Sequence, residues 1–93
     1  MSVTVQIPTP LRRFTDDRAE VELEGTTVGA VLNALIQRYG SLERHLYQDG
    51  KLRSFVNIFL GDEDVRHLDG EATPVADGDT LTIIPAIAGG GPE

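Results

Sequence analysis

One strongly amphipathic segment, residues 28–39, constrains the fold of this chain more than any other feature. Its apolar residues step by three, one, three, one and three positions, which places them on one stripe of a helix with 3.6 residues per turn. They are Val28, Val31, Leu32, Leu35, Ile36 and Tyr39. A hydroxyl of Thr26 or Thr27 can accept from the free N–H groups at the helix start, and Gly40 is a residue type common just past a helix end. A single stripe of this kind needs one apolar surface to cover it.

Segments of alternating polarity on both sides of the helix predict a sheet that provides this surface. The predicted strands are Ser2–Pro8, Ala19–Glu24, Phe55–Leu60, a short Asp64–Arg66 and Thr80–Ile84. Pro85 ends the last strand because it has no backbone N–H. We expect the helix stripe to share one core with Val3, Val5, Ile7, Ile58 and Ile83.

The connections complete this organisation. Ser41–Tyr47 can form a short helical turn, Gln48–Lys51 a turn, and Pro74–Asp79 a loop into the last strand. The order is strand, strand, helix, strand, short strand, strand, without an internal repeat. Such an order predicts a two-layer α+β domain with the helix packed across one face of a sheet.

Size and charge exclude several classes of protein. The 93 residues suffice for one domain, and eight basic against fifteen acidic side chains give a net charge of −7. That charge argues against nucleic acid and anionic membranes as partners, and fits docking onto basic protein surfaces. The chain has no cysteine, so disulfides, thiolate metal sites and cysteine nucleophiles are excluded. No secretory signal or membrane-spanning run is recognisable, which predicts a soluble, cytoplasmic protein.

No group of residues predicts catalysis, a cofactor or a metal site. His45 and His67 lack further ligands at workable spacing, and the acidic cluster Asp62-Glu63-Asp64 lacks the second half of a calcium loop. The run Gly89-Gly90-Gly91 is not a phosphate loop, because no helix follows it. These features are interpreted as surface and turn residues.

The end of the sequence allows two interpretations. Residues 86–93 have no packing pattern, so we expect a domain over residues 1–85 followed by a mobile tail. Glycines at a terminus can simply form a flexible end. Alternatively, a side-chain-free glycine strand can enter a narrow channel and present its terminal carboxylate to another enzyme.

Motifs along the whole chain up to Gly90 resemble the ubiquitin-like sulfur carriers of the MoaD/ThiS type, most closely the CysO-like carriers of cysteine biosynthesis. The matching segments are Val3-Thr4-Val5, Ile7-Pro8, Gly29-Ala30-Val31, Phe55-Val56-Asn57-Ile58, Asp62-Glu63-Asp64-Val65-Arg66, Ala76-Asp77-Gly78-Asp79 and Ile84-Pro85-Ala86-Ile87-Ala88-Gly89-Gly90. The Phe-Val-Asn-Ile segment, the acidic turn and the final Pro-Ala-x-Ala-Gly-Gly are jointly specific in that order.

This resemblance implies a β-grasp fold and a carrier without catalytic activity of its own. In the family, an ATP-dependent E1-like enzyme adenylates the C-terminal glycine, and a sulfur donor converts it to a thiocarboxylate. In the CysO-like branch a cysteine synthase passes the sulfur to an activated serine, and a JAMM-type zinc protease releases the product. Gly90 would be the reactive terminus and Gly89 the slim residue before it. Phe59 on the exposed sheet face is a candidate for docking the activating enzyme.

The sequence departs from the family where Gly91-Pro92-Glu93 follow the diglycine. Adenylation needs a free carboxylate, so the chain is expected to be a precursor whose last residues are removed. Three glycines leave two registers, and the spacing from Pro85 favours Gly90 over Gly91 as the mature end. Alternatives are a protein modifier conjugated to lysines, the small subunit of molybdopterin synthase, and a β-grasp binding module with an inert tail.

Overall fold

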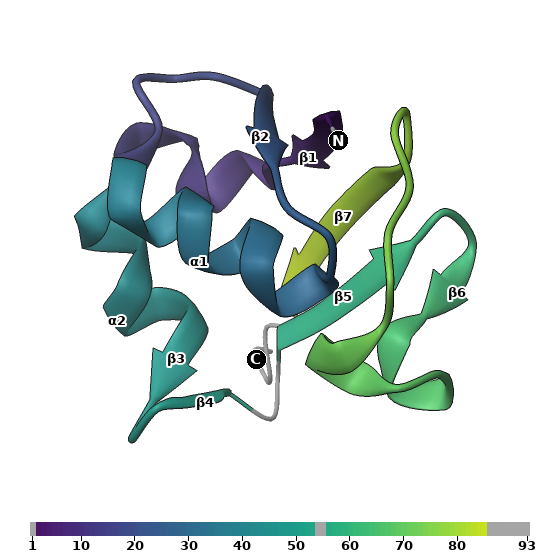
Figure 1. Ribbon diagram of the computed structural model, residues 1–93. Helices are drawn as coiled ribbons and strands as arrows, with labels where there is room; N and C mark the ends of the chain where they lie inside the picture. The colour runs from purple at the N-terminus through teal and green to yellow at the C-terminus, as the bar shows by residue number, and fades with distance from the viewer. Residues whose placement is uncertain (1, 54–55, 86–93) are drawn as a thin grey trace.

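A mixed five-stranded sheet and one long helix form the two layers of the molecule, shown as a computed structural model in Figure 1. The structure describes residues 2–53 and 56–85. The strands lie in the order β2 (Glu20–Glu24), β1 (Ser2–Gln6), β7 (Thr80–Pro85), β5 (Val56–Leu60) and β6 (Glu63–Asp64). β1 and β7 pair in parallel, and the other neighbours pair antiparallel. The predicted α+β architecture is confirmed.

The helix α1 (Val28–Arg38) begins and ends for identifiable reasons. The Thr27 hydroxyl oxygen accepts a hydrogen bond from the Ala30 N–H at 3.1 Å, as expected for an N-cap threonine. At the other end, Tyr39 is the C-cap, so Gly40 lies just past the end of the helix, where it was expected. Inside the helix, a Cβ added at Gly29 would lie 3.1 Å from the Glu71 carbonyl oxygen. The small residue therefore lets the first turn of α1 approach the segment around Glu71.

The core lies between α1 and the sheet. Val28, Val31, Leu32 and Leu35 of the helix stripe are buried, whereas Ile36 and Tyr39 at its border are partly buried. The predicted core partners are buried in the same cluster and comprise Val3, Val5, Ile7, Ile58 and Ile83. Alternation along each strand thus sends apolar side chains to the helix and polar ones to the outer face.

Two local predictions need correction. The short strand expected at Asp64–Arg66 is β6 at Glu63–Asp64, because the Asp64 carboxylate accepts the Arg66 N–H at 2.9 Å and starts a 3-10 turn over Val65–His67. β7 continues through Pro85, which pairs with Val56 at the strand end. The structure also has a 3-10 turn at Thr9–Phe14, where no element was predicted, and this turn buries Leu11.

A second, small sheet follows the helix. After the 3-10 turn Gly40–Leu42 comes the short helix α2 (Glu43–Leu46), and β3 (Tyr47–Gln48) pairs with β4 (Lys51–Leu52). Asp49 and Gly50 connect the two strands with φ of 55° and 79°. Positive φ at both central residues is typical of a tight hairpin turn, so the expected turn is a complete hairpin. A last 3-10 turn, Gly70–Ala72, lies before β7.

Candidate functional site

The predicted reactive residue Gly90, together with Gly89 and Gly91, lies outside the described residues, as does the whole predicted tail 86–93. The start of the segment Phe55–Leu60 also lies outside them, since β5 is described from Val56. The structure describes the end of the sheet that precedes this tail in the sequence. There, Pro85 at the end of β7 pairs with Val56 at the start of β5.

One row of outer-face residues crosses all five strands of the main sheet. It runs through Glu20, Gln6, Thr82, Phe59 and Asp64, which are register partners from β2 to β6. The Thr82 hydroxyl donates to Gln6 Oε1 at 3.1 Å, and the Gln6 amide reaches Glu20 Oε2 at 3.5 Å. The β1–β2 half of the row is therefore polar and hydrogen-bonded, whereas Phe59 provides an apolar surface in the other half.

Phe59 and Ile84 are diagonal neighbours on this outer face, because Phe59 pairs with Thr82 and Ile84 with Asn57. Phe59 is partly exposed, and Ile84 is 44% exposed, which is unusual for a large aliphatic side chain in a sheet. The structure thus places Phe59 on the outer face, next to buried Ile58, while its role in docking stays a prediction. No pattern in the sequence marks Ile84 as a site residue; only the strand register places it beside Phe59.

Arg66 binds the chain at the start of β5, next to the end of β7. One guanidinium nitrogen donates to Asn57 Oδ1 at 2.8 Å, and the other donates to the Val56 carbonyl oxygen at 2.7 Å. The Asp64 cap fixes the backbone from which Arg66 extends. The planar guanidinium holds several N–H donors in a rigid arrangement, which suits two acceptors in fixed positions. Arg66 therefore anchors the start of β5, beside the end of β7. In the sequence, only the acidic turn before Arg66 hints at this role.

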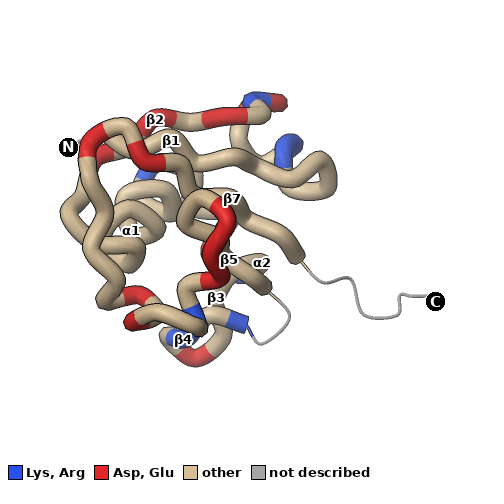
Figure 2. The backbone as a smooth tube through the Cα atoms, turned by 90° about the vertical axis from the view of Figure 1, so that its right-hand side faces the viewer, with Lys and Arg blue, Asp and Glu red and all other residues tan. Residues whose placement is uncertain are grey.

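Charge is distributed unevenly over the molecule (Figure 2). Acidic side chains follow β2 and the turn into β6, at Glu20, Glu22, Glu24 and residues 62–64. A small basic group surrounds His45, whose ring stacks on Phe14 with centroids 4.4 Å apart. Burial of the imidazole, followed by the charges of Arg44, Arg13 and Arg53, lowers the pKa of His45 below 6.5. His45 is therefore a packed side chain, while His67 is exposed.

The Tyr47 side chain links β3 to the 3-10 turn before β7. Its hydroxyl donates to Glu71 Oε1 at 2.9 Å. Burial raises the pKa of the Tyr47 hydroxyl strongly, and the hydrogen bond to Glu71 and the nearby acidic charges raise the pKa further. Tyr47 therefore stays protonated and serves as a donor that joins the small sheet to the rest of the fold.

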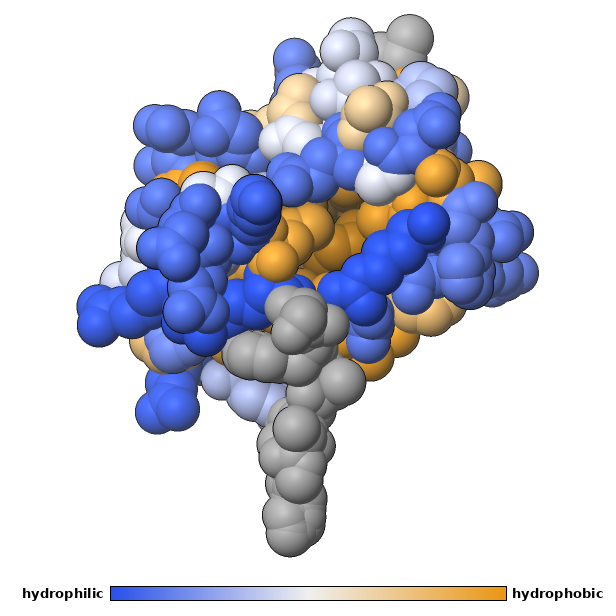
Figure 3. All heavy atoms as spheres, turned by 90° about the horizontal axis from the view of Figure 1, so that it is seen from below, coloured by the Kyte–Doolittle hydropathy of each residue, from blue (hydrophilic) through white to orange (hydrophobic). Residues whose placement is uncertain are grey.

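Apolar side chains are also visible on the face seen from below in Figure 3. There they lie between strongly hydrophilic side chains. Within residues 2–53 and 56–85, no three His, Asp or Glu side chains are grouped in a way that could hold a metal ion. No helix of the described chain is long and apolar enough to span a membrane.

Comparison with known proteins places these features in a family context. Residues 5–90 match the ThiS family. The sulfur carrier protein CysO of Mycobacterium tuberculosis is 48% identical over 93 residues, covering 97% of this chain and 100% of the relative. Small archaeal modifier protein 3 of Haloferax volcanii is 40% identical over 67 residues, covering 72% and 73% of the two chains.

A solved structure matches over nearly the whole chain. In the crystal structure of the BexX/CysO complex of Amycolatopsis orientalis, a chain 44% identical to this one superimposes with a TM-score of 0.87, covering 94% of this chain and 98% of the other. This likeness confirms the ubiquitin-like β-grasp fold.

Proposed function

The chain belongs to the ThiS family, and we propose that it is a sulfur carrier whose reactive group is the carboxylate of Gly90. The observation that carries the proposal is the extent of the family match, which stops at residue 90 although three more residues follow. The CysO relatives, named as sulfur carriers, support the same role. In this proposal the protein is a substrate of other enzymes and catalyses no step itself.

The chemistry proceeds in two balanced steps. The Gly90 carboxylate oxygen attacks ATP in an E1-like enzyme, so that an acyl adenylate forms and pyrophosphate leaves. Hydrosulfide from a sulfur donor then attacks the acyl carbon, and AMP leaves with the bonding electron pair, which yields a thiocarboxylate. Because the thiocarboxylate is itself the nucleophile, the carrier needs no cysteine, in agreement with its composition.

The fold supports delivery of Gly90 into a partner. An extended chain spans at most about 3.5 Å per residue, so the five residues after Pro85 let Gly90 reach up to about 17 Å beyond the sheet. We assign residues 1–85 to the folded domain and 86–93 to the segment that enters the enzyme. Gly89 has no side chain to obstruct a narrow channel.

The activating enzyme docks on the apolar pair Phe59 and Ile84 in this proposal. Both side chains lie on the outer face beside the end of β7, and partly exposed apolar neighbours are typical of interfaces. Phe59→Ser and Ile84→Ser should each lower the rate of adenylation with the cognate enzyme, while Glu24→Gln, at the exposed end of β2, should leave it unchanged. Equal adenylation rates in all three variants would contradict this docking role.

Residues after Gly90 must be removed first, because an amide at Gly90 has no free carboxylate. The expected processing enzyme is a JAMM-type zinc protease, in which metal-bound water attacks the Gly90 carbonyl. The further partners are a sulfur donor and a sulfur-accepting enzyme. We propose a cysteine synthase as the acceptor, by analogy with the CysO relatives.

Three forms of the protein test the proposal: the full chain, the chain ending at Gly90 and the chain ending at Gly91. Each is incubated with the E1-like enzyme, ATP and sulfide, and thiocarboxylate formation is measured by mass. Only the form ending at Gly90 should gain sulfur. Equal reaction of the full chain would contradict the precursor role. Reaction of the Gly91 form alone would show that Gly91, and not Gly90, is the reactive terminus.

The likeness to an archaeal modifier favours a second candidate, conjugation of Gly90 to lysine side chains. Both functions share adenylation and differ in the acceptor. Blotting extracts of the source cells for this protein distinguishes them: a ladder of heavier adducts indicates a modifier, and a single low-mass band indicates a carrier.

A further inference from the structure

Among residues 2–53 and 56–85, no strand pairs with the outer edge of β2. β2 is one end of the sheet order and is five residues long, whereas the other edge, β6, has two residues. Just before β2, the Ile7 N–H donates to the Ala19 carbonyl oxygen at 2.8 Å. Hydrogen-bonded and non-hydrogen-bonded pairs alternate along antiparallel strands, so the backbone groups of Val21 and Leu23 form hydrogen bonds with β1. The backbone N–H and C=O groups of Glu20, Glu22 and Glu24 therefore face the free edge.

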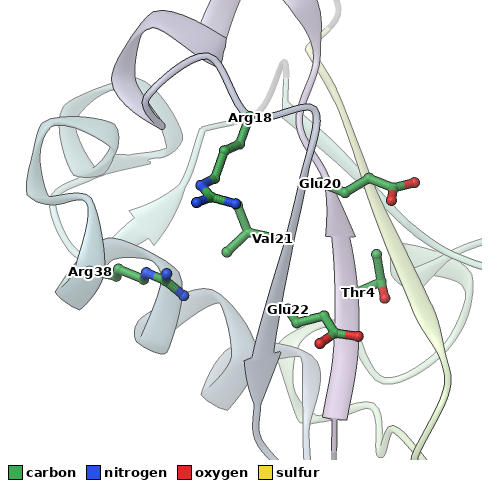
Figure 4. Close-up of a pocket in the computed structure, with 6 residues that line it drawn as sticks. All are labelled: Thr4, Arg18, Glu20, Val21, Glu22 and Arg38. Atoms are coloured by element: carbon green, nitrogen blue, oxygen red, sulfur yellow. The ribbon is translucent and has the colours of Figure 1, made fainter.

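A shallow pocket of about 480 Å³ lies along this edge (Figure 4). That is far more space than one water molecule, about 30 Å³, so the pocket has room for several side chains. On the α1 side, Arg18 and Arg38 extend toward the pocket from the loop before β2 and from the last residue of the helix. On the outer side, Glu20 and Glu22 line the same pocket.

Neither arginine is neutralised within residues 2–53 and 56–85. Arg18 and Arg38 are exposed, and their side chains take part in no hydrogen bond or ion pair; Arg38 only lies over the Tyr39 ring at 5.5 Å. Two uncompensated guanidinium groups facing one pocket are notable in a chain with an excess of acidic residues. They provide positive charge on one side of β2, while the glutamates provide negative charge on the other.

We infer that the β2 edge binds an extended segment of a partner protein, in which acidic and basic side chains alternate. Such a segment would add a sixth strand through the free backbone groups of β2. Successive side chains of a strand point to opposite faces. Its acidic residues would therefore meet Arg18 and Arg38 on the α1 side, and its basic residues would meet the glutamates on the outer side. This site lies at the β2 edge, on other strands than Phe59 of β5 and Ile84 of β7, and does not depend on sulfur transfer.

A second copy of this chain is a poor occupant of the same edge. All three outer-face residues of β2 are glutamates, at positions 20, 22 and 24. Antiparallel pairing of two β2 strands that keeps the faces aligned would place carboxylates opposite carboxylates, which is destabilising. Exposed edge strands commonly carry charges that prevent such self-pairing. The charges of β2 thus disfavour pairing with the β2 strand of a second copy and favour pairing with a segment of alternating charge.

Titration of the ¹⁵N-labelled protein with a capped peptide about as long as β2, in which glutamate and arginine alternate, tests the inference. A peptide of the same composition, with its glutamates in one half and its arginines in the other, is the control. The alternating peptide should shift the amide signals of Glu20, Glu22 and Glu24, whose N–H groups face the edge. The double variant R18E/R38E, which changes two exposed side chains, should weaken its binding by roughly 2- to 30-fold, as expected for two cross-strand charge pairs.

A second variant addresses the backbone itself. Glu22→Pro removes the central edge-facing N–H and should abolish the shifts, whereas Glu22→Gln, which keeps the N–H, should retain most of the binding. Equal binding of the block peptide, unchanged binding by R18E/R38E, or shifts confined to Phe59 and Ile84 would each overturn the inference. None of these results bears on thiocarboxylate formation, so failure here is distinguishable from failure of the proposed carrier function.

Discussion

Arg66 illustrates how a single exposed side chain stabilises the sheet next to its last described residue, Pro85. Its two guanidinium nitrogens hold the Val56 carbonyl oxygen and the Asn57 amide oxygen at 2.7 and 2.8 Å. These acceptors belong to the first two described residues of β5. The start of β5, which pairs with the end of β7, is therefore held by two guanidinium donors in a rigid arrangement that lysine cannot reproduce.

We expect Arg66→Lys to lower the free energy of unfolding by about 1 kcal/mol, because a point charge cannot satisfy both acceptors at once. Urea denaturation followed by circular dichroism measures this loss. Arg38→Lys is the matched control, and should change stability by less than about 0.5 kcal/mol because its guanidinium forms no hydrogen bond with the described residues. Equal effects of the two substitutions would contradict the anchoring role of Arg66.

His45 gives the protein an acid-sensitive stability. Its pKa in the folded protein is lower than 6.5 because of burial and three neighbouring arginines, so the unfolded chain binds the proton more tightly. Stability is therefore retained above about pH 6.5 and lost as the pH falls toward the folded pKa. Between about pH 7.5 and about pH 5, the wild type should lose more unfolding free energy than His45→Gln. Parallel pH profiles of the two proteins would refute this effect.

At the scale of elements, α1 contributes most of the apolar surface that covers the sheet. Leu35 lies in the middle of its stripe and is fully buried. Leu35→Ala should lower the free energy of unfolding by about 2–5 kcal/mol, because it leaves a cavity between the helix and the strands. Gln37→Ala, on the exposed side of the same helix, is the control and should change stability little. A loss well below 1 kcal/mol at Leu35 would contradict tight packing of α1.

Elements with strong periodicity could be predicted from the sequence, whereas elements set by a single local contact could not. The stripe of α1 and the alternation of β1, β2 and β7 each repeat several times, so tertiary packing agrees with the pattern. β6 ends earlier than predicted because one carboxylate, Asp64, caps a turn. Asp49-Gly50 is a recognised hairpin signal, but strands of two residues have no alternation to detect.

For the whole molecule, the candidate site is only partly predictable for the same reason. Phe59 could be identified as an exposed-face residue, because alternation within β5 opposes it to buried Ile58. Its neighbour Ile84 and the pair Arg18 and Arg38 come together only through strand register and helix placement. No spacing in the sequence indicates residues that meet across twenty or more positions. The Gly90 assignment rests on motif and family extent and remains a prediction.

The two proposed interaction surfaces lie on different strands and suit different partners. The apolar pair beside the end of β7 would suit the enzyme proposed to act on Gly90, and the charged edge at β2 would suit an extended segment.

The most direct test of the carrier function is the intact mass of the protein purified from its own cells under non-reducing conditions. The account predicts loss of the residues after Gly90, together with a fraction in which one carboxylate oxygen is replaced by sulfur. Full-length protein that never carries sulfur, in cells that express the complete activating system, would contradict it.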